Sequence, residues 1–181
     1  MDRYWLLTWT TYGTWLPGDR RGFVSPVRQD EGTHVVHNVP GTPIDCDMPD
    51  LERAMRQSMK GRPIRLTQEQ ATVVLDQFHE TAAYRGWQLL AAAVMANHVH
   101  LVAGVLGDPE PERLLHSFKS YATRALNRRW QRPTNGTWWT SSGSKRKLPD
   151  RRAVQGAVRY VLNQQHPLAV WSPGKPASGG C

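Results

Sequence analysis

Two apolar runs, Trp87–Met95 and His98–Val105, constrain the fold of this chain more than any other feature. Each run has the length of a buried strand and is too short to cross a bilayer. Only Ala96 and Asn97 separate the runs, and so short a connection permits only an antiparallel hairpin. We therefore predict that this hairpin forms the centre of a sheet, where any functional side chain would stand on rigid backbone.

The second run carries two histidines, His98 and His100, on either side of Val99. Alternate residues of a strand point to the same face and lie roughly 7 Å apart. The two imidazoles could therefore converge on one metal ion while Val99 and Leu101 face the core. A single His-x-His pair is more often accidental, so its interpretation depends on a second group of residues.

That second group lies in a predicted helix near the end of the chain. Tyr160 and Gln164 are four residues apart, so they share a helical face about 5–6 Å apart at Cβ. A phenol could act as a nucleophile and an amide as a third metal ligand. Tyr121 is the rival nucleophile, but Ala125 stands four residues after it, and we interpret Tyr121 as a packing residue.

The remaining pattern indicates one domain over residues 1–168, with a long insertion at about 13–62 and a disordered tail at 169–181. The predicted elements are a strand at 4–12, a short helix at 50–59, a helix from the Thr67/Gln70 capping box to Gly86, a helix over 114–126, a turn and short strand at 135–139, a basic loop at 141–149 and a helix capped by Asp150. His79 falls off the apolar stripe of its helix and is predicted to face solvent.

The positive charge is concentrated in one region. The net charge is +8, and the segment from Arg113 to Arg159 holds twelve Lys or Arg and one acid, so that the rest of the chain is net negative. This distribution favours a phosphate-binding face over a uniformly basic surface. Trp138 or Trp139 could stack on unpaired bases, although either could belong to the core. The residues predicted to contact DNA are Lys119, Arg124, Arg128, Trp138, Trp139, Lys145, Arg146, Lys147, Arg151 and Arg152.

Other signals are weak. His34, His37 and Asp45-Cys46-Asp47 could bind a metal ion, but no helix or strand pattern supports them. Two cysteines do not indicate a disulfide framework or a zinc motif of paired cysteines. Without a signal peptide or a membrane-spanning run, we expect a cytoplasmic, nucleoid-associated protein with no membrane partner.

Asn97-His98-Val99-His100-Leu101 resembles the histidine-hydrophobe-histidine motif of single-tyrosine HUH transposases, and Tyr160-Val161-Leu162-Asn163-Gln164 resembles their nucleophile helix. The resemblance covers roughly residues 4–12 and 64–168. The length and the basic middle are similar to relatives associated with repetitive extragenic palindromes. The Gly13–Arg62 segment departs from the family because it is longer than the usual connection.

The resemblance implies an α+β fold of the ferredoxin-like or RRM-like kind, in which helices flank a central antiparallel sheet. It implies Tyr160 as nucleophile, with His98, His100 and Gln164 as ligands of a divalent metal, Mg²⁺ or Mn²⁺, although imidazoles would also tolerate zinc. The partner would be single-stranded DNA with hairpin elements, cleaved through a 5′-phosphotyrosine and rejoined, and a second copy of the chain could join the first as a homodimer. Two alternatives stay open: an inactive hairpin-binding protein, and a metal-dependent nuclease that uses water.

Overall fold

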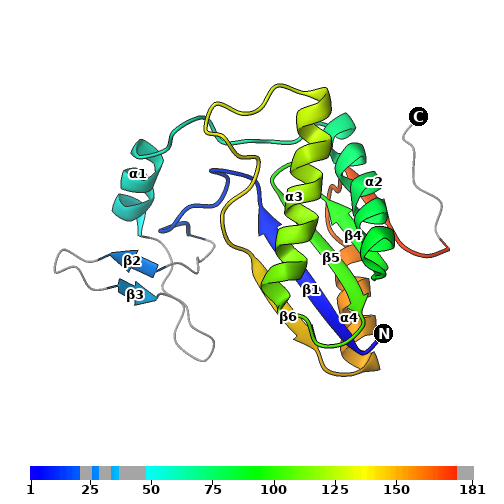
Figure 1. Ribbon diagram of the computed structural model, residues 1–181. Coiled ribbons are helices and arrows are strands. Elements are labelled where there is room, and N and C mark those ends of the chain that lie inside the picture. Colours follow the sequence, from blue (N-terminus) through cyan, green and yellow to red (C-terminus); the bar gives the residue numbers. More distant parts are fainter. Residues whose placement is uncertain (21–25, 29–33, 37–47, 175–181) are drawn as a thin grey trace.

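The protein is an α+β domain built on a five-stranded antiparallel sheet, as predicted. The computed structural model describes residues 1–20, 26–28, 34–36 and 48–174. The sheet has the order β6-β1-β5-β4-β7 (Figure 1), and three of the four described helices flank it. The strands are β1 (Arg3–Thr10), β4 (Gln88–Val94), β5 (His98–Val105), β6 (Ser144–Leu148) and β7 (Ala169–Trp171), and the helices are α1 (Pro49–Gln57), α2 (Gln68–Arg85), α3 (Pro111–Arg129) and α4 (Arg151–Leu162).

The predicted hairpin is β4 and β5, and β5 is the middle strand of the sheet. β1 pairs with β5 along its whole length, and Thr8 lies opposite His100. Directly opposed residues share a face of the sheet. Val99 and Leu101 are fully buried on the other face from the two histidines, as the alternation predicts.

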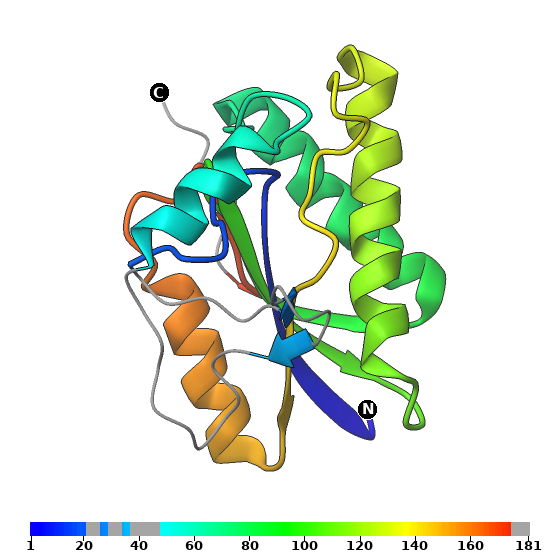
Figure 2. The ribbon, with the colours of Figure 1, turned by 90° about the vertical axis from the view of Figure 1, so that its left-hand side faces the viewer.

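Helices cover both faces of the sheet, and the two layers differ in the size of their side chains. Figure 2 shows α2 and α3 on one side and α4 on the other. The α2/α3 side contains large rings, and Phe78 packs edge-on against Trp9 and Phe118. The α4 side is lined by small residues such as Ala91 and Ala93. The histidines therefore lie on the face whose buried hydrophobic core contains no aromatic ring in the described part of the chain.

Local sequence signals at the helix ends are confirmed. Thr67 accepts a hydrogen bond from the Gln70 amide and forms the full capping box with it. Gly86 ends α2 with a left-handed φ of 65°, a conformation that glycine adopts without strain. Asp150 caps α4 through the Ala153 amide, 2.7 Å away.

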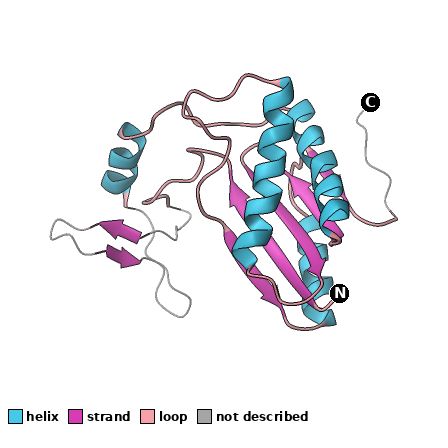
Figure 3. Ribbon diagram, in the orientation of Figure 1, coloured by secondary structure: helices cyan, strands magenta, loops and turns pink. Residues whose placement is uncertain are grey.

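Three predictions at the edges of the sheet are wrong (Figure 3). The basic segment predicted as a loop at 141–149 contains β6, which pairs with β1 as a lysine-rich edge strand. The tail predicted to begin at residue 169 instead supplies β7, which pairs with β4. The strand predicted near 139 is a single bridge between Thr11 and Trp139. All three depend on contacts between segments far apart in sequence.

His79 is also not where its helix pattern put it. Its ring packs edge-on against Trp171 with centroids 4.3 Å apart, and the burial lowers its pKa. β7 returns over α2 after the end of α4, so no pattern within α2 could predict this cover. By contrast, Tyr84 on the same helix is 74% exposed.

The predicted short helix in the 13–62 insertion is confirmed as α1. β2 (Pro26–Arg28) and β3 (His34–Val36) pair as a separate two-stranded sheet. The other candidate metal ligands of this insertion, His37 and Asp45-Cys46-Asp47, lie outside the described residues. The division into one domain, an insertion and a tail otherwise stays a prediction.

The aromatic packing on the α2/α3 face predicts a large effect of Phe78→Ala. Phe78 is fully buried between β1 and α3, so truncation would leave a cavity and destabilise the fold by about 3–5 kcal/mol. Tyr84→Ala, on the exposed side of α2, is the control and should change stability by less than about 0.5 kcal/mol. Urea unfolding monitored by circular dichroism measures both, and equal midpoints for the two variants would contradict this packing.

Candidate active site

His98, His100 and Tyr160 lie together on the α4 face of the sheet. The rings of His98 and His100 have centroids 4.9 Å apart, and the rings of His100 and Tyr160 have centroids 5.1 Å apart. The phenolic oxygen of Tyr160 is 3.5 Å from Nε2 of His100. Two segments sixty residues apart in sequence therefore meet at one point, as the sequence analysis predicted.

His100 is buried, and a threonine of the neighbouring strand fixes its ring. Thr8 Oγ1 lies 2.6 Å from Nδ1 of His100. With the hydrogen on Nδ1, Thr8 accepts it, and the unprotonated Nε2 faces Tyr160. Burial, and to a smaller extent the neighbouring His98, lower the pKa of His100 to about 4. The ring is therefore neutral at pH 7, which is the form that binds metal ions.

His98 is held by its neighbour in the hairpin turn. Nδ1 of His98 lies 2.7 Å from Oδ1 of Asn97. An amide oxygen only accepts hydrogen bonds, so Nδ1 is the donor, and in the neutral ring Nε2 carries the lone pair. Both imidazoles therefore have a partner on Nδ1 that orients them, an arrangement common among metal-ligating histidines.

Tyr160 combines a buried neighbour with access to solvent. Its side chain is 50% exposed although its hydroxyl reaches the buried His100. Ala157 and Val161 on the same helix are buried against the sheet, and this packing fixes the rotation of α4 about its axis. A large substrate could therefore approach the phenol from solvent without any rearrangement of the core.

Gln164 lies just beyond α4, because the helix ends at Leu162 and not near residue 165 as predicted. Its amide nitrogen donates to the carbonyl oxygen of Tyr160, 3.0 Å away, and so satisfies one of the last carbonyls of the helix. Gln164 therefore stays within one turn of the nucleophile. Its role as a metal ligand remains a prediction.

The donor set at this site suits a small divalent ion. Among the described residues, no three His, Cys, Asp or Glu side chains lie close enough together to hold a metal ion. A cation here would therefore be bound by two neutral imidazoles, with an amide oxygen or substrate and water oxygens completing its shell. Such a set leaves coordination positions open, as catalytic metal sites do.

Lys119, predicted to contact DNA, is instead partly buried beside the segment that precedes β6. Its ammonium group donates to the carbonyl oxygens of Thr140, Ser141 and Ser142. Burial lowers its pKa to about 8. The structure therefore gives Lys119 a role in holding this segment, while contact with DNA stays a prediction.

The other predicted cations are divided between the two sides of the sheet. Lys145 forms an ion pair with Glu112, and Lys147 forms one with Asp108. Arg146 lies opposite Leu6, on the face that carries Tyr160. Four further exposed cations lie on helices, on α3 at Arg124 and Arg128 and in the first turn of α4 at Arg151 and Arg152.

Burial contradicts the predicted stacking role of the two tryptophans. Trp138 and Trp139 are only 5% and 3% exposed. Their indole nitrogens donate to Asn127 and Thr123 of α3, respectively. Both rings therefore join α3 to the segment beside β1, and neither offers a face to a base. The sequence contained no local signal that separates such rings from exposed ones.

Sequence reasoning also missed Thr8 and Asn97 as partners of the histidines. The sequence pattern indicates Asn97 only as a turn residue and Thr8 only as part of a β-rich run. The register of β1 on β5 identifies Thr8, since it stands directly opposite His100. Nothing short of strand pairing could have selected it among the neighbouring threonines.

The model of the family described as "Transposase IS200 like" matches residues 57–164, more than half of the chain. Among solved structures, a REP-associated tyrosine transposase bound to a REP hairpin is similar at 12% identity and a TM-score of 0.49, with 88% of this chain and 64% of that chain covered. A candidate transposase from Deinococcus radiodurans R1 is similar at 16% identity and a TM-score of 0.42, with 92% and 94% covered. The chain thus spans less than two thirds of the first of these structures. No curated protein matches.

None of the described helices is long and apolar enough to cross a membrane.

The lowered pKa of His100 predicts acid sensitivity of the metal-free fold. Its folded-state value is below that of the unfolded chain, so protons bind the unfolded state more strongly between about pH 6.5 and pH 4. Stability should therefore fall as the pH is lowered through this range, by up to about 3 kcal/mol from this group. Urea unfolding at several pH values in the presence of EDTA measures the loss.

His100→Gln, which does not titrate, is the matched variant. Its unfolding free energy should depend less on pH than that of the wild type over the same range. An identical slope for both proteins would show that His100 is not the group responsible.

Proposed function

The chain belongs to the family of IS200-like transposases, and from this premise we propose that it is a metal-dependent enzyme that cleaves and rejoins single-stranded DNA beside hairpins, with Tyr160 as its nucleophile. The observation that carries the proposal is the 3.5 Å approach of the Tyr160 oxygen to His100 on the one sheet face that also holds His98. The Tyr160 phenol is half exposed beside this histidine pair, so a substrate can reach it from solvent.

In the proposed reaction the phenolic oxygen of Tyr160 attacks the phosphorus of a DNA phosphodiester. The bond from phosphorus to the 3′ oxygen breaks, the phenolic proton passes to water, and the leaving 3′ oxygen takes up a proton. The products are a 5′-phosphotyrosine and a free 3′-hydroxyl. Because the phosphodiester energy is retained in the covalent bond, a 3′-hydroxyl can attack it and restore the phenol without any further cofactor.

His98 and His100 are the residues that would hold a divalent ion, Mg²⁺ or Mn²⁺, and Gln164 is the third candidate ligand. Such an ion, when bound, supplies Lewis-acid polarisation of the scissile phosphate. The chain's own contribution is the orientation of the ligands. Thr8 and Asn97 each engage one Nδ1, so that both rings are fixed before substrate arrives.

Binding of the DNA itself is proposed to involve the exposed cations on both sides of the sheet. Arg146, Arg151 and Arg152 lie on the side of Tyr160 and could neutralise phosphates near the site of attack. Arg124 and Arg128 lie on α3 and could contact duplex phosphates of a hairpin. A homodimer and nucleoid association are further parts of the proposal.

Tyr160→Phe should abolish covalent attachment of the protein to DNA, because only the attacking oxygen is removed. The measurement is a denaturing gel of the protein incubated with labelled, hairpin-containing single-stranded DNA and Mn²⁺. Tyr121→Phe is the control, since Tyr121 lies on α3, on the opposite side of the sheet, and should form adduct like the wild type.

Each alternative function predicts a different set of products on the gel. A nuclease that uses water would give cut DNA with no adduct in the wild type, and cleavage would survive in Tyr160→Phe. An inactive hairpin-binding protein would give neither product while still shifting the DNA in a native gel.

The role of Thr8 predicts a weaker metal site in Thr8→Val, which keeps the shape of the side chain but removes the hydrogen-bond acceptor of His100. Loss of such an orienting partner typically lowers metal affinity about 10–100-fold. Electron paramagnetic resonance of free Mn²⁺ measures the affinity without any turnover. His98→Ala should lose more metal affinity than Thr8→Val. His116→Ala, which removes an exposed histidine of α3, should bind Mn²⁺ like the wild type. Unchanged affinity in His98→Ala would exclude the histidine pair as the metal site.

A further inference from the structure

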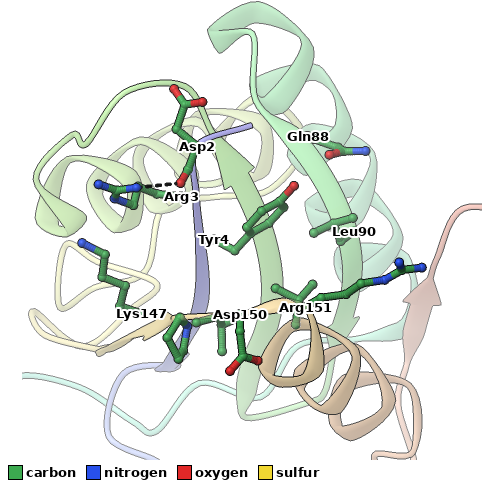
Figure 4. Close-up of a pocket in the computed structure, with 11 residues that line it drawn as sticks. Asp2, Arg3, Tyr4, Gln88, Leu90, Lys147, Asp150 and Arg151 are labelled. Atoms are coloured by element: carbon green, nitrogen blue, oxygen red, sulfur yellow. Dashed lines mark hydrogen bonds between the residues drawn. The ribbon is translucent and has the colours of Figure 1, made fainter.

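A cavity separate from the histidine site opens on the same face of the sheet near the start of α4. Its volume is about 840 Å³, within the range of pockets that bind small organic ligands. Its walls come from the first residues of β1, the start of β4, the end of β6 and the first turn of α4. Figure 4 shows the ring of Tyr4 across its middle, with Lys147 and Arg151 on opposite sides.

Tyr4 provides an aromatic platform in this cavity. Tyr4 lies opposite Gly104 in the register of β1 on β5. A Cβ at position 104 would come within 2.8 Å of Cε1 of Tyr4, so the ring lies directly on the glycine backbone. Because Gly104 has no side chain, the ring of Tyr4 can pack over the backbone of the neighbouring strand β5. Leu90 and Val154 add apolar surface around it.

The rim of the cavity is polar, and its free charges are positive. The carboxylate of Asp2 accepts from the Gly107 amide, and that of Asp150 caps α4. Arg3 and Lys147 share Asp108 as an ion-pair partner. Arg151, by contrast, forms no ion pair within the described part of the chain and is exposed. The acids are therefore engaged, and at least one cation can meet an anionic group of a ligand.

Three groups of the cavity match the parts of a nucleotide. The ring of Tyr4 suits a base, the amide of Gln88 suits the edge of that base, and the guanidinium of Arg151 suits a phosphate. Tyrosine rings stack on unpaired bases of any type. Gln88, exposed on the other side of Gly104 from Tyr4, carries both a donor and an acceptor for the edge of a base. A guanidinium forms paired hydrogen bonds to phosphate oxygens.

We propose that this cavity holds one unpaired nucleotide of the same DNA strand that Tyr160 attacks, with its base on Tyr4, its edge against Gln88 and a phosphate at Arg151. This inference rests on the proposed function and adds to it a contact that positions the strand. The nucleotide must be unpaired because a base in a duplex does not expose its face for stacking.

The spacing between the cavity and Tyr160 fits a short stretch of DNA. Arg151 and Tyr160 are nine residues apart on one helix, which corresponds to about 14 Å. Tyr4 and Thr8 are four residues apart on β1, which gives about 13 Å along the sheet. At the 3.4 Å rise of stacked nucleotides this is about four positions, and fewer if the strand is extended. The cavity would thus fix which phosphodiester reaches Tyr160.

Binding of DNA tests the cavity independently of cleavage. The probe is a fluorescein-labelled pool of randomised 12-nucleotide single strands, with EDTA present, and the readout is fluorescence anisotropy. Tyr4→Leu keeps apolar packing but removes the ring, and we expect about tenfold weaker binding. Tyr4→Phe should bind like the wild type, as should Tyr84→Ala, which removes an exposed tyrosine on the far side of the sheet.

Arg151→Gln is the second test, since an exposed substitution does not endanger the fold. It should weaken binding and reduce its dependence on salt. Arg129→Gln removes an exposed arginine of α3 that is assigned no DNA contact, so this matched control should bind like the wild type. Wild-type affinity in both Tyr4→Leu and Arg151→Gln would overturn the proposal.

The position of the nucleotide is tested by sequencing both products of cleavage with Mn²⁺, the DNA attached to Tyr160 and the released strand that ends in a 3′-hydroxyl. The wild type should show a base preference within about four positions of the cleaved bond, and Tyr4→Leu should lose it. Adduct formation with the same preference in both proteins would overturn the cavity assignment while leaving Tyr160 chemistry intact. Weaker binding by Tyr4→Leu without any wild-type adduct would support the cavity and reject the proposed reaction.

Discussion

The pairing of β1 with β5 determines the geometry on which the candidate site depends. This register sets Thr8 against His100 and puts both histidines on the α4 face. A slip of one residue would turn every side chain of the shifted strand to the other face, so Thr8 would lose His100 and Trp9 would leave the core. The large rings of the opposite layer resist such a slip, because Trp9 packs against both Phe78 and Trp139.

The second determinant is the rotation of α4. Ala157 and Val161 are buried against the sheet, and Tyr160 lies beside this stripe, half exposed. Successive residues of a helix are separated by about 100°, so a change of one residue in the packed stripe would carry the phenol away from His100. The Asp150 cap fixes where the helix begins. The position where α4 begins and the rotation of the helix about its axis together direct the Tyr160 hydroxyl to the His100 imidazole.

Much of this arrangement could be predicted because its causes are local. The β4–β5 hairpin follows from two apolar runs and a two-residue break, and the shared face of His98 and His100 follows from strand alternation. The burial of Trp139, the β6 edge strand and the cover of His79 could not be predicted, since each depends on a segment distant in sequence. For the same reason the sequence does not identify Thr8 as the partner of His100.

The α2/α3 layer and the α4 layer have different roles, and the sizes of their side chains explain the difference. Large rings fill the α2/α3 face, where burial provides most of the hydrophobic stabilisation. On the other face, alanines of β4 and Gly104 of β5 add little side-chain volume between the sheet and α4. On this face the Tyr160 hydroxyl reaches His100, and the missing side chain of Gly104 lets the ring of Tyr4 lie over the sheet. Small residues on this face thus serve the candidate site and the cavity at Tyr4 alike.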